Sequence, residues 1–234
     1  MIEWIFPVRC PICNQIVVPK GVMFHPSCIE KLEFIVEPLC KKCGMPLASE
    51  EQEYCKECIL KDRGWDFGRS VFYYRGAVQR ALYQMKQEGT REFVHFFALQ
   101  MKKTQKDYIR EVVPDCLVPV PLHPSKFRKR GFNQAELLAR DLSNEIQIPI
   151  RLLLKKKRKT KDQKNLNRKE RKKNIENVFC VDKEETKKGI PKSVLLIDDV
   201  STTGSTLTEC AKVLKKQGVQ KVAFLSVCAG EQLG

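Results

Sequence analysis

Short apolar runs alternate with amphipathic stretches from about residue 64 onward. Apolar runs bounded by glycine, proline or charged residues are typical of buried strands, and we expect strands over 67–74, 116–121, 150–154, 194–198 and 222–227. Between them apolar residues recur at every third or fourth position, which predicts helices over 77–88, 91–107, 135–146 and 168–175, and one ending at 216. This alternation predicts an α/β fold with a mostly parallel sheet flanked by helices, and a ligand site beyond the carboxyl ends of the strands.

Two carboxylates and a hydroxyl-rich loop follow one of these strands. The apolar run from Val194 to Ile197 leads into Asp198-Asp199, and the chain then continues as Val200-Ser201-Thr202-Thr203-Gly204-Ser205-Thr206. We call residues 202–206 the hydroxyl loop. Free N–H groups at a helix N-terminus, the helix dipole and several hydroxyl groups together suit a phosphate group. Carboxylates would repel a phosphate, so we expect Asp198 and Asp199 to accept hydrogen bonds from sugar hydroxyls or to assist a divalent cation.

The same loop also has a purely structural explanation. Thr206-x-x-Glu209 has the spacing of a capping box, which would make the segment an ordinary strand-to-helix turn. The loop does not match a Walker loop, because no Gly-Lys-Ser or Gly-Lys-Thr follows the glycine. Paired carboxylates beside a hydroxyl-rich loop pack poorly without a ligand, and this favours a binding site.

Cysteine pairs dominate the beginning of the chain. Seven of the eleven cysteines lie before residue 60 and, with one histidine, form four pairs separated by two residues. This spacing lets both side chains of a pair reach one tetrahedral ion and is typical of structural zinc sites. Joining successive pairs needs the shortest loops and predicts two Zn²⁺ sites, with the ligands Cys10, Cys13, His25, Cys28 and Cys40, Cys43, Cys55, Cys58. His25 as a half-exposed surface residue, and a different combination of pairs, stay open as alternatives.

Charge divides the chain into two parts. Residues 1–63 carry eight basic and nine acidic residues, a net charge of −1, although the whole chain has a net charge of +15. Residues 155–173 carry twelve basic and two acidic residues, a net charge of +10, and residues 126–130 add +4. The long basic run is a solvated loop, a nucleic-acid contact or mobile charge near a ligand. The near-neutral first part argues against strong phosphate contacts by that part alone.

We therefore expect a zinc-binding module over 1–63, which depends on its metal for folding, and an α/β domain over 64–234. No apolar run approaches the roughly 18 residues of a membrane span, and the first residues lack the basic region of a secretory signal. The sequence thus predicts a cytoplasmic protein. Its other cysteines are expected to be buried free thiols, namely Cys116, Cys180, Cys210 and Cys228.

The segment from Asp198 to Thr206 resembles the fingerprint of the type I phosphoribosyltransferases. In that family the two acidic residues hold the ribose 2′ and 3′ hydroxyls of phosphoribosyl pyrophosphate, and the following loop wraps the 5′-phosphate. Val118-Pro-Val-Pro-Leu-His123, followed by Arg130-Gly-Phe-Asn-Gln134 and preceded by the double zinc ribbon, resembles the ComF family of competence-associated proteins. The resemblance covers nearly the whole chain. His25 departs from the commoner four-cysteine first ribbon.

The resemblance implies roles for the two basic segments. The turn after Val120 corresponds to a pyrophosphate loop, and the run from Lys155 to about Lys173 corresponds to a flexible loop that closes over the ligand. The candidate side chains of the pyrophosphate loop are His123, Lys126, Arg128 and Arg130. The implied ligands are phosphoribosyl pyrophosphate and Mg²⁺, and the implied partners are single-stranded DNA and other competence proteins. We therefore expect a competence protein that binds phosphoribosyl pyrophosphate and takes part in the uptake or processing of single-stranded DNA.

Two other functions stay open. An active phosphoribosyltransferase would transfer 5-phosphoribosyl to a nitrogen acceptor and release pyrophosphate, but only seven residues follow Val227, too few for a C-terminal hood over the acceptor. His123 is the candidate acid or base, and a histidine that caps the backbone would explain it equally well. The third alternative, a zinc-ribbon adaptor with a degenerate transferase domain, gives the intact hydroxyl loop no role.

Overall fold

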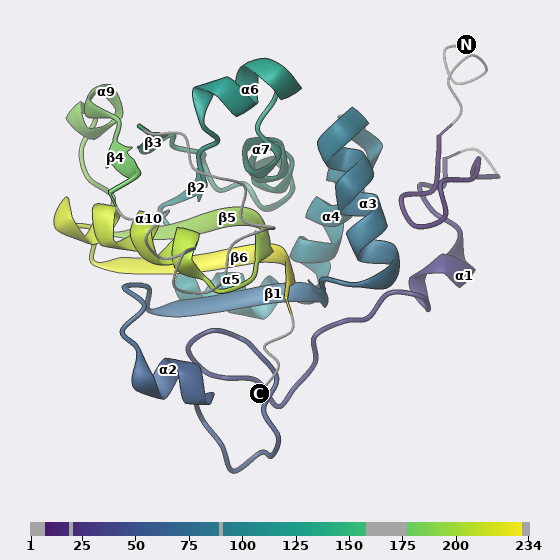
Figure 1. The fold of residues 1–234 in the computed structure, drawn as a ribbon, viewed down its shortest axis with the longest axis horizontal. Coiled ribbons are helices and arrows are strands. Elements are labelled where there is room, and N and C mark those ends of the chain that lie inside the picture. The colour runs from purple at the N-terminus through teal and green to yellow at the C-terminus, as the bar shows by residue number, and fades with distance from the viewer. Residues whose placement is uncertain (1–7, 19–20, 89–90, 158–176, 231–234) are drawn as a thin grey trace.

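A parallel sheet forms the centre of the protein (Figure 1). The structure is a computed structural model and describes residues 8–18, 21–88, 91–157 and 177–230. Four of the strands in these ranges form the sheet, in the order β1 (Phe67–Tyr73), β6 (Lys221–Ala229), β5 (Ser193–Ser201) and β2 (Cys116–Pro119). All three pairings are parallel, and Leu225 of β6 lies opposite both Arg69 and Ile197. The predicted α/β architecture is confirmed.

The two faces of the sheet belong to two separate cores, because successive side chains of a strand point to opposite faces. Leu195 and Ile197 of β5 lie in one core, with helices α3 (Gly76–Glu88), α4 (Arg91–Thr104), α5 (Lys106–Val112) and α7 (Gln134–Ile146). Val194 and Leu196 lie in the other, with α10 (Ser205–Lys216) and the antiparallel hairpin of β3 (Leu154–Lys156) and β4 (Phe179–Val181). In the part of the chain that the structure describes, no helix has the length and apolar character needed to cross a membrane.

The helix expected over 91–107 is divided in the structure. Gln105, with φ −117° and ψ 22°, lies outside the helical range and separates α4 from α5. The helix expected over 168–175 lies outside the described residues. Of the strand expected over 150–154, Ile150 forms a single bridge with Leu117 of β2, beside Pro149, a residue with no N–H to donate, and only Leu154 lies in a strand, β3.

The basic segment after β2 forms a helix that the sequence analysis did not expect, α6 (Pro124–Arg130). Pro124 occupies the first helical position, where its missing N–H costs nothing, and His123 is the N-cap. Gly131 ends the helix with φ +83°, a left-handed conformation that glycine adopts without strain. The strand β4 and the short helix α9 (Lys183–Lys187) were not expected either.

The cysteine-rich region contains the short helices α1 (Pro26–Ile29) and α2 (Lys56–Leu60) and lies along the β1 side of the sheet (Figure 1). The segment between these helices follows the outer edge of β1. Ile35 N donates to Val71 O at 2.9 Å, and Phe34 forms an antiparallel bridge with Phe72. The cysteine-rich region therefore adds a short antiparallel edge to the parallel sheet.

Candidate functional site

The two carboxylates lie on the last part of β5, at the carboxyl end of the sheet. β5 continues to Ser201, beyond the end that the sequence predicts, and Asp198 still pairs with Ser226 of β6. Asp198 Oδ1 accepts a hydrogen bond from Asp199 N at 2.9 Å. Because the two residues are neighbours on a strand, their side chains start on opposite faces, Asp199 on the α3 side and Asp198 on the α10 side.

Lys86 is a member of this site that the sequence analysis missed. It lies near the end of α3, and its Nζ is 2.5 Å from Asp199 Oδ2. Both side chains are largely buried, with 25% and 15% of their surfaces exposed. Lys86 follows Leu82 by four residues, so it lies on the apolar face of the predicted helix. A lysine on the apolar face of an amphipathic helix is the sequence signal by which Lys86 could have been found.

Burial and charge give the two carboxyl groups different pKa values. Burial raises the pKa of Asp198 well above its ordinary value, and the negative charge of Asp199 adds to this. Burial would also raise the pKa of Asp199, but the ammonium group of Lys86 outweighs it and holds that pKa below the ordinary value. The two neighbouring carboxyl groups therefore differ in how readily they take up a proton, and the one with the raised pKa, Asp198, is the one more able to donate a hydrogen bond.

The hydroxyl loop turns directly into α10. Gly204 is the N-cap, with φ +69°, and no side chain caps the helix. Thr206 lies inside the first turn, so the capping box that offered a structural explanation does not form. Thr203 Oγ1 and Ser205 Oγ share a hydrogen bond of 2.8 Å. The loop thus presents hydroxyl groups beside the first N–H groups of a twelve-residue helix, which have no partners within the helix.

The back of the hydroxyl loop packs against the end of the cysteine-rich region. A Cβ on Gly204 would lie 2.5 Å from Trp65 Cη2 and 3.2 Å from Arg63 Nη1. Arg63 Nη1 donates to Thr203 O at 2.6 Å. Neither Arg63 nor Trp65 was singled out from the sequence, since their contacts with the loop span some 140 residues of chain.

The four basic-turn candidates occupy different places in the structure. His123 Nδ1 accepts a hydrogen bond from Ser125 N at 3.1 Å, so this histidine caps α6, the structural alternative left open by the sequence. Arg128 is exposed, whereas Arg130 is half-buried. Burial lowers the pKa of Arg130, and the charge of Asp199 acts in the opposite direction. Of the candidate arginines, the structure thus places Arg130 in the electrostatic environment of the carboxylates.

Lys156, the last residue of β3, belongs to the same environment. Burial lowers its pKa, the positive charge of Lys126 lowers it further, and Asp198 partly offsets both effects. Lys126 of α6 and Lys156 therefore gather positive charge on the Asp198 side of the strand end. The predicted flexible run continues past Lys157, and residues 158–173 lie outside the described residues.

The predicted zinc ligands gather into two groups. We call Cys10, Cys13, His25 and Cys28 the first cluster, and Cys40, Cys43, Cys55 and Cys58 the second cluster. Within each cluster the ligand atoms lie within 4.8 Å of one another. Cys43 Sγ and Cys55 Sγ are 3.7 Å apart, close to the roughly 3.8 Å that two thiolates on a tetrahedral zinc ion would have. The donor sets and their spacing fit a double zinc ribbon.

His25 has the surroundings of a metal ligand. Its Nδ1 is 3.4 Å from Cys13 Sγ, whereas its Nε2 faces Ile16 O at 3.2 Å. A ligating histidine usually donates its other N–H group to a carbonyl or carboxylate, which fixes the ring. This arrangement fits Nδ1 as the metal-binding atom.

The sulfur atoms of the second cluster stabilise a thiolate. Hydrogen bonds from Cys43 and Cys58 lower the pKa of Cys40, and its sulfur also accepts from Cys55 N at 3.4 Å. Among the other cysteines, Cys116, Cys210 and Cys228 are buried free thiols as expected, but Cys180 on the edge strand β4 is only half-buried. The expectation for Cys180 is therefore wrong, because an edge strand leaves one side uncovered.

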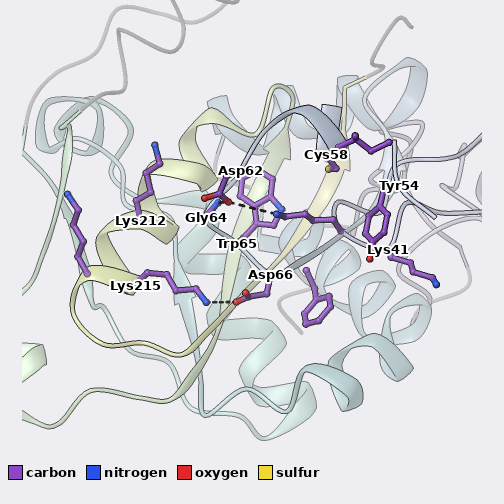
Figure 2. Close-up of a pocket in the computed structure, with 13 residues that line it drawn as sticks. Lys41, Tyr54, Cys58, Asp62, Gly64, Trp65, Asp66, Lys212 and Lys215 are labelled. Atoms are coloured by element: carbon purple, nitrogen blue, oxygen red, sulfur yellow. Dashed lines mark hydrogen bonds and ion pairs between the residues drawn. The ribbon is translucent and has the colours of Figure 1, made fainter. Parts of the chain in front are cut away.

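A pocket of about 830 Å³ lies between the second cluster and α10, away from the carboxylates (Figure 2). Two of the α10 lysines that line it are already paired with acidic side chains. Lys215 Nζ lies 2.7 Å from Asp66 Oδ2, and Lys212 Nζ lies 3.3 Å from Glu209 Oε1. These ion pairs weaken the positive field in the pocket, so the end of β5 is the better candidate for a phosphorylated ligand.

Two family models match the chain. A double zinc ribbon domain matches residues 1–59, and a phosphoribosyl transferase domain matches residues 132–233. The second match contains β5, the carboxylates and the hydroxyl loop. The predicted domain boundary between residues 63 and 64 stays a prediction.

Curated relatives align with most of this chain. Competence protein F of Haemophilus influenzae is 31% identical over 79% of this chain and 82% of its own length. Competence protein ComFC of Bacillus subtilis is 31% identical over 82% of this chain and 78% of its own length. DNA utilization protein YhgH of Escherichia coli is 29% identical over 81% of this chain and 83% of its own length.

Proposed function

Since this chain belongs to the ComF family, with Competence protein F and ComFC among its relatives, we propose that it binds phosphoribosyl pyrophosphate with Mg²⁺ and acts on single-stranded DNA. The relatives and the phosphoribosyl transferase domain support a role in competence. The ligand, the cation and the DNA contact are our proposal, and each has its own support and test.

The position of Asp198 and Asp199 beside the hydroxyl loop is the observation that carries the ligand proposal. The ionised Asp199 would accept hydrogen bonds from ribose hydroxyls, and Asp198 would donate or accept according to its protonation state. The 5′-phosphate would take the N–H groups of the first turn of α10, where the positive end of the helix dipole lies. The hydroxyl groups of Thr203 and Ser205 would exchange their mutual hydrogen bond for phosphate oxygens.

The pyrophosphate group of the ligand needs positive charge. We expect three residues near the end of β5 to supply this charge, namely Lys126, Arg130 and Lys156. Mg²⁺ binds phosphates together with one or two carboxylates, so Asp198 and Asp199 are the residues that would hold it. The cation would neutralise the oxygens that lie nearest to these carboxylates.

Calorimetric titration with phosphoribosyl pyrophosphate and Mg²⁺ tests the ligand proposal on zinc-loaded protein. We expect heat of binding that is lost in the double variant Asp198→Asn/Asp199→Asn. Glu184→Gln on α9 is the matched control, since this acidic side chain is exposed and pairs only with the neighbouring Lys187 among the described residues. If wild-type protein gives no heat, or if the double variant binds as wild type does, the ligand proposal is wrong.

The DNA part of the proposal rests on the charge distribution. Residues 155–173 carry a net charge of +10, and α6 exposes Arg128 and Lys129. We expect the affinity for a fluorescently labelled single strand, followed by anisotropy, to fall steeply with salt concentration. Neutralising Arg128 and Lys129 together should weaken binding more than neutralising Lys41 and Lys61 of the cysteine-rich region. The opposite ranking would contradict this placement of the DNA surface.

A further inference from the structure

We propose that Arg63 is a positioning residue for the hydroxyl loop, and that through Arg63 the metal in the second cluster controls how tightly the loop binds phosphate. The inference rests on the proposed function, because it concerns the same loop. It adds a residue and a regulatory input that act from outside the phosphoribosyl transferase domain match.

Arg63 is a buried cation between the cysteine-rich region and the loop. Only 6% of its surface is exposed. Nη1 donates to Thr203 O at 2.6 Å, and Nη2 lies 3.2 Å from Glu57 Oε2. A guanidinium group taken out of water needs a counter-charge and partners for its donors. Glu57 and Thr203 O serve Nη2 and Nη1, which holds Arg63 in one orientation, whereas Nε has no hydrogen-bond partner among the described residues. Arg63 therefore contacts the backbone of the hydroxyl loop through Thr203 O, on the side that faces the cysteine-rich region.

The contact with Thr203 fixes the direction of a donor. In a trans peptide the carbonyl and the next N–H group point in opposite directions. With Thr203 O held by Arg63, the N–H of Gly204 faces away from the guanidinium group. A donor that already has its bound orientation costs no reorganisation when an anion arrives. Arg63 thereby raises the affinity of the loop without touching the ligand.

The second cluster holds Glu57, the acidic partner of Arg63, in place. Glu57 lies in α2, between the ligands Cys55 and Cys58, and Cys55 is the N-cap of that helix. A helix of five residues is not stable alone, so α2 depends on a metal ion that ties these cysteines to the rest of the cluster. Loss of the ion would release α2, and with it the carboxylate that orients Arg63.

The residues directly after Arg63 are fixed to the sheet domain. The Arg63 side chain is therefore held beside the hydroxyl loop, and a change in its orientation acts on Thr203. Asp66 Oδ2 accepts from Val222 N at 2.8 Å and from Lys215 Nζ at 2.7 Å, and Figure 2 shows this pair at the edge of the pocket. Trp65 is 3% exposed and packs edge-on against Phe224, with ring centroids 5.0 Å apart. The second cluster also comes close to the loop directly, since Cys43 and Thr203 line one small cavity.

Calorimetry with phosphoribosyl pyrophosphate and Mg²⁺ tests the role of Arg63. We expect Arg63→Met to weaken binding about 10- to 100-fold, the effect of losing one charge-assisted hydrogen bond, and Glu57→Gln to weaken it less. Arg63→Lys, which keeps a charged donor, should recover part of the affinity. Lys61→Met is the matched control, because Lys61 also contacts Glu57, at 2.7 Å, but is partly exposed at the surface. Zinc content should be unchanged in all four variants.

Removing one ligand from each cluster, in separate variants, tests whether the metal in the second cluster controls the phosphate affinity of the loop. Cys58→Ser should lower the affinity of the loop, whereas Cys28→Ser should lower it less. Equal losses would overturn the regulatory part of the inference. Cys58→Ser could fail to fold, which near-ultraviolet circular dichroism would show. In that case the zinc-loaded Glu57→Gln variant is used, and unchanged affinity in this variant would refute the link through Arg63.

A second readout separates this inference from the proposed function. Hydrogen exchange of the Gly204 and Ser205 amides should be faster in Arg63→Met than in wild type, with no ligand added. Absence of wild-type binding heat refutes the ligand proposal alone. Wild-type binding with unchanged affinity and unchanged exchange in Arg63→Met refutes the role of Arg63.

Discussion

The two cysteine clusters are built on the same pattern but are attached to the sheet domain in different ways. The first cluster is attached by apolar side chains. Cys10, Ile12 and Val17 belong to the core that contains α3 and α4, and Phe24 packs edge-on against Phe96 of α4 with ring centroids 5.3 Å apart. The first cluster is thus an extension of the main core.

The second cluster is attached by polar and backbone contacts. Its cysteines form a small apolar group of their own. Gly44 lies against β1 so closely that a Cβ there would be 2.5 Å from Gly68 O, and Arg69 Nη1 of β1 donates to Cys40 O at 3.5 Å. Arg63 completes the attachment at Thr203.

The two attachments therefore contribute differently, one to the stability of the fold and the other to the orientation of the hydroxyl loop. Apolar burial is non-directional and scales with the area removed from water, so the first attachment mainly stabilises the fold. Hydrogen bonds are directional, so the second attachment mainly fixes the hydroxyl loop. Changes in the first attachment should therefore lower the free energy of unfolding, and changes in the second should lower ligand affinity.

The largest expected effect is on the apolar attachment. Phe96 is fully buried and contacts both Phe24 and Phe97. We expect Phe96→Ala to lower the free energy of unfolding by about 3–5 kcal/mol, measured by urea denaturation. Phe67→Ala, at a residue 38% exposed, should cost much less. A folded Phe96→Ala protein that keeps its stability but loses ligand affinity would break the comparison.

Gly204→Ala tests the polar attachment from the loop side. The substitution places a Cβ against Trp65 and forces alanine into a left-handed conformation with φ +69°. We expect a loss of about 2–3 kcal/mol in unfolding free energy and a large loss of affinity for phosphoribosyl pyrophosphate. Gly189→Ala is the matched control, since φ there is +96° but no atom lies within 4 Å of the new Cβ. The control should cost about 1 kcal/mol and leave affinity unchanged. Equal effects of the two substitutions would show that contact with Trp65 is unimportant.

Lys86 on α3 connects the apolar attachment to the site. We expect Lys86→Met to lower the free energy of unfolding by about 1–2 kcal/mol near neutral pH, less than the roughly 3–5 kcal/mol for one partner of a fully buried pair. The pair lowers the pKa of Asp199 in the folded state, so its contribution is present above the unfolded value of about 3.9 and is lost as pH falls. The wild-type and variant curves of stability against pH should therefore converge toward acid. Lys102 also lowers the pKa of Glu145, so Lys102→Met should give curves that converge in the same direction but by a smaller amount, because that pair is more exposed.

Parts of this molecule whose partners are near in sequence, or whose apolar patterns are unbroken, could be predicted from the sequence. β5 could be placed because an apolar run from Val194 to Ile197 fits a strand buried on both faces. The two cysteine clusters follow from the two-residue spacing, which brings ligands together over short loops.

Contacts between distant segments could not be predicted. Arg63 and Thr203 are separated by 140 positions, and no local pattern marks either as a partner of the other. α6 was missed for a different reason. Its charge density favoured a loop, but Pro124 and Gly131 supply a start and a stop, and its basic residues are accommodated because it lies at the surface.

The smallest expected effect concerns a surface ion pair of the second cluster. Lys41 pairs with Glu53, and their side chains are 60% and 58% exposed. An exposed pair gains little, because water screens the attraction and ordering two long side chains costs entropy. We expect Lys41→Met to change neither the urea midpoint nor the affinity for phosphoribosyl pyrophosphate measurably. A clear loss of affinity would mean that surface charge, and not the buried contacts of Gly44 and Arg63, holds the second cluster against the loop.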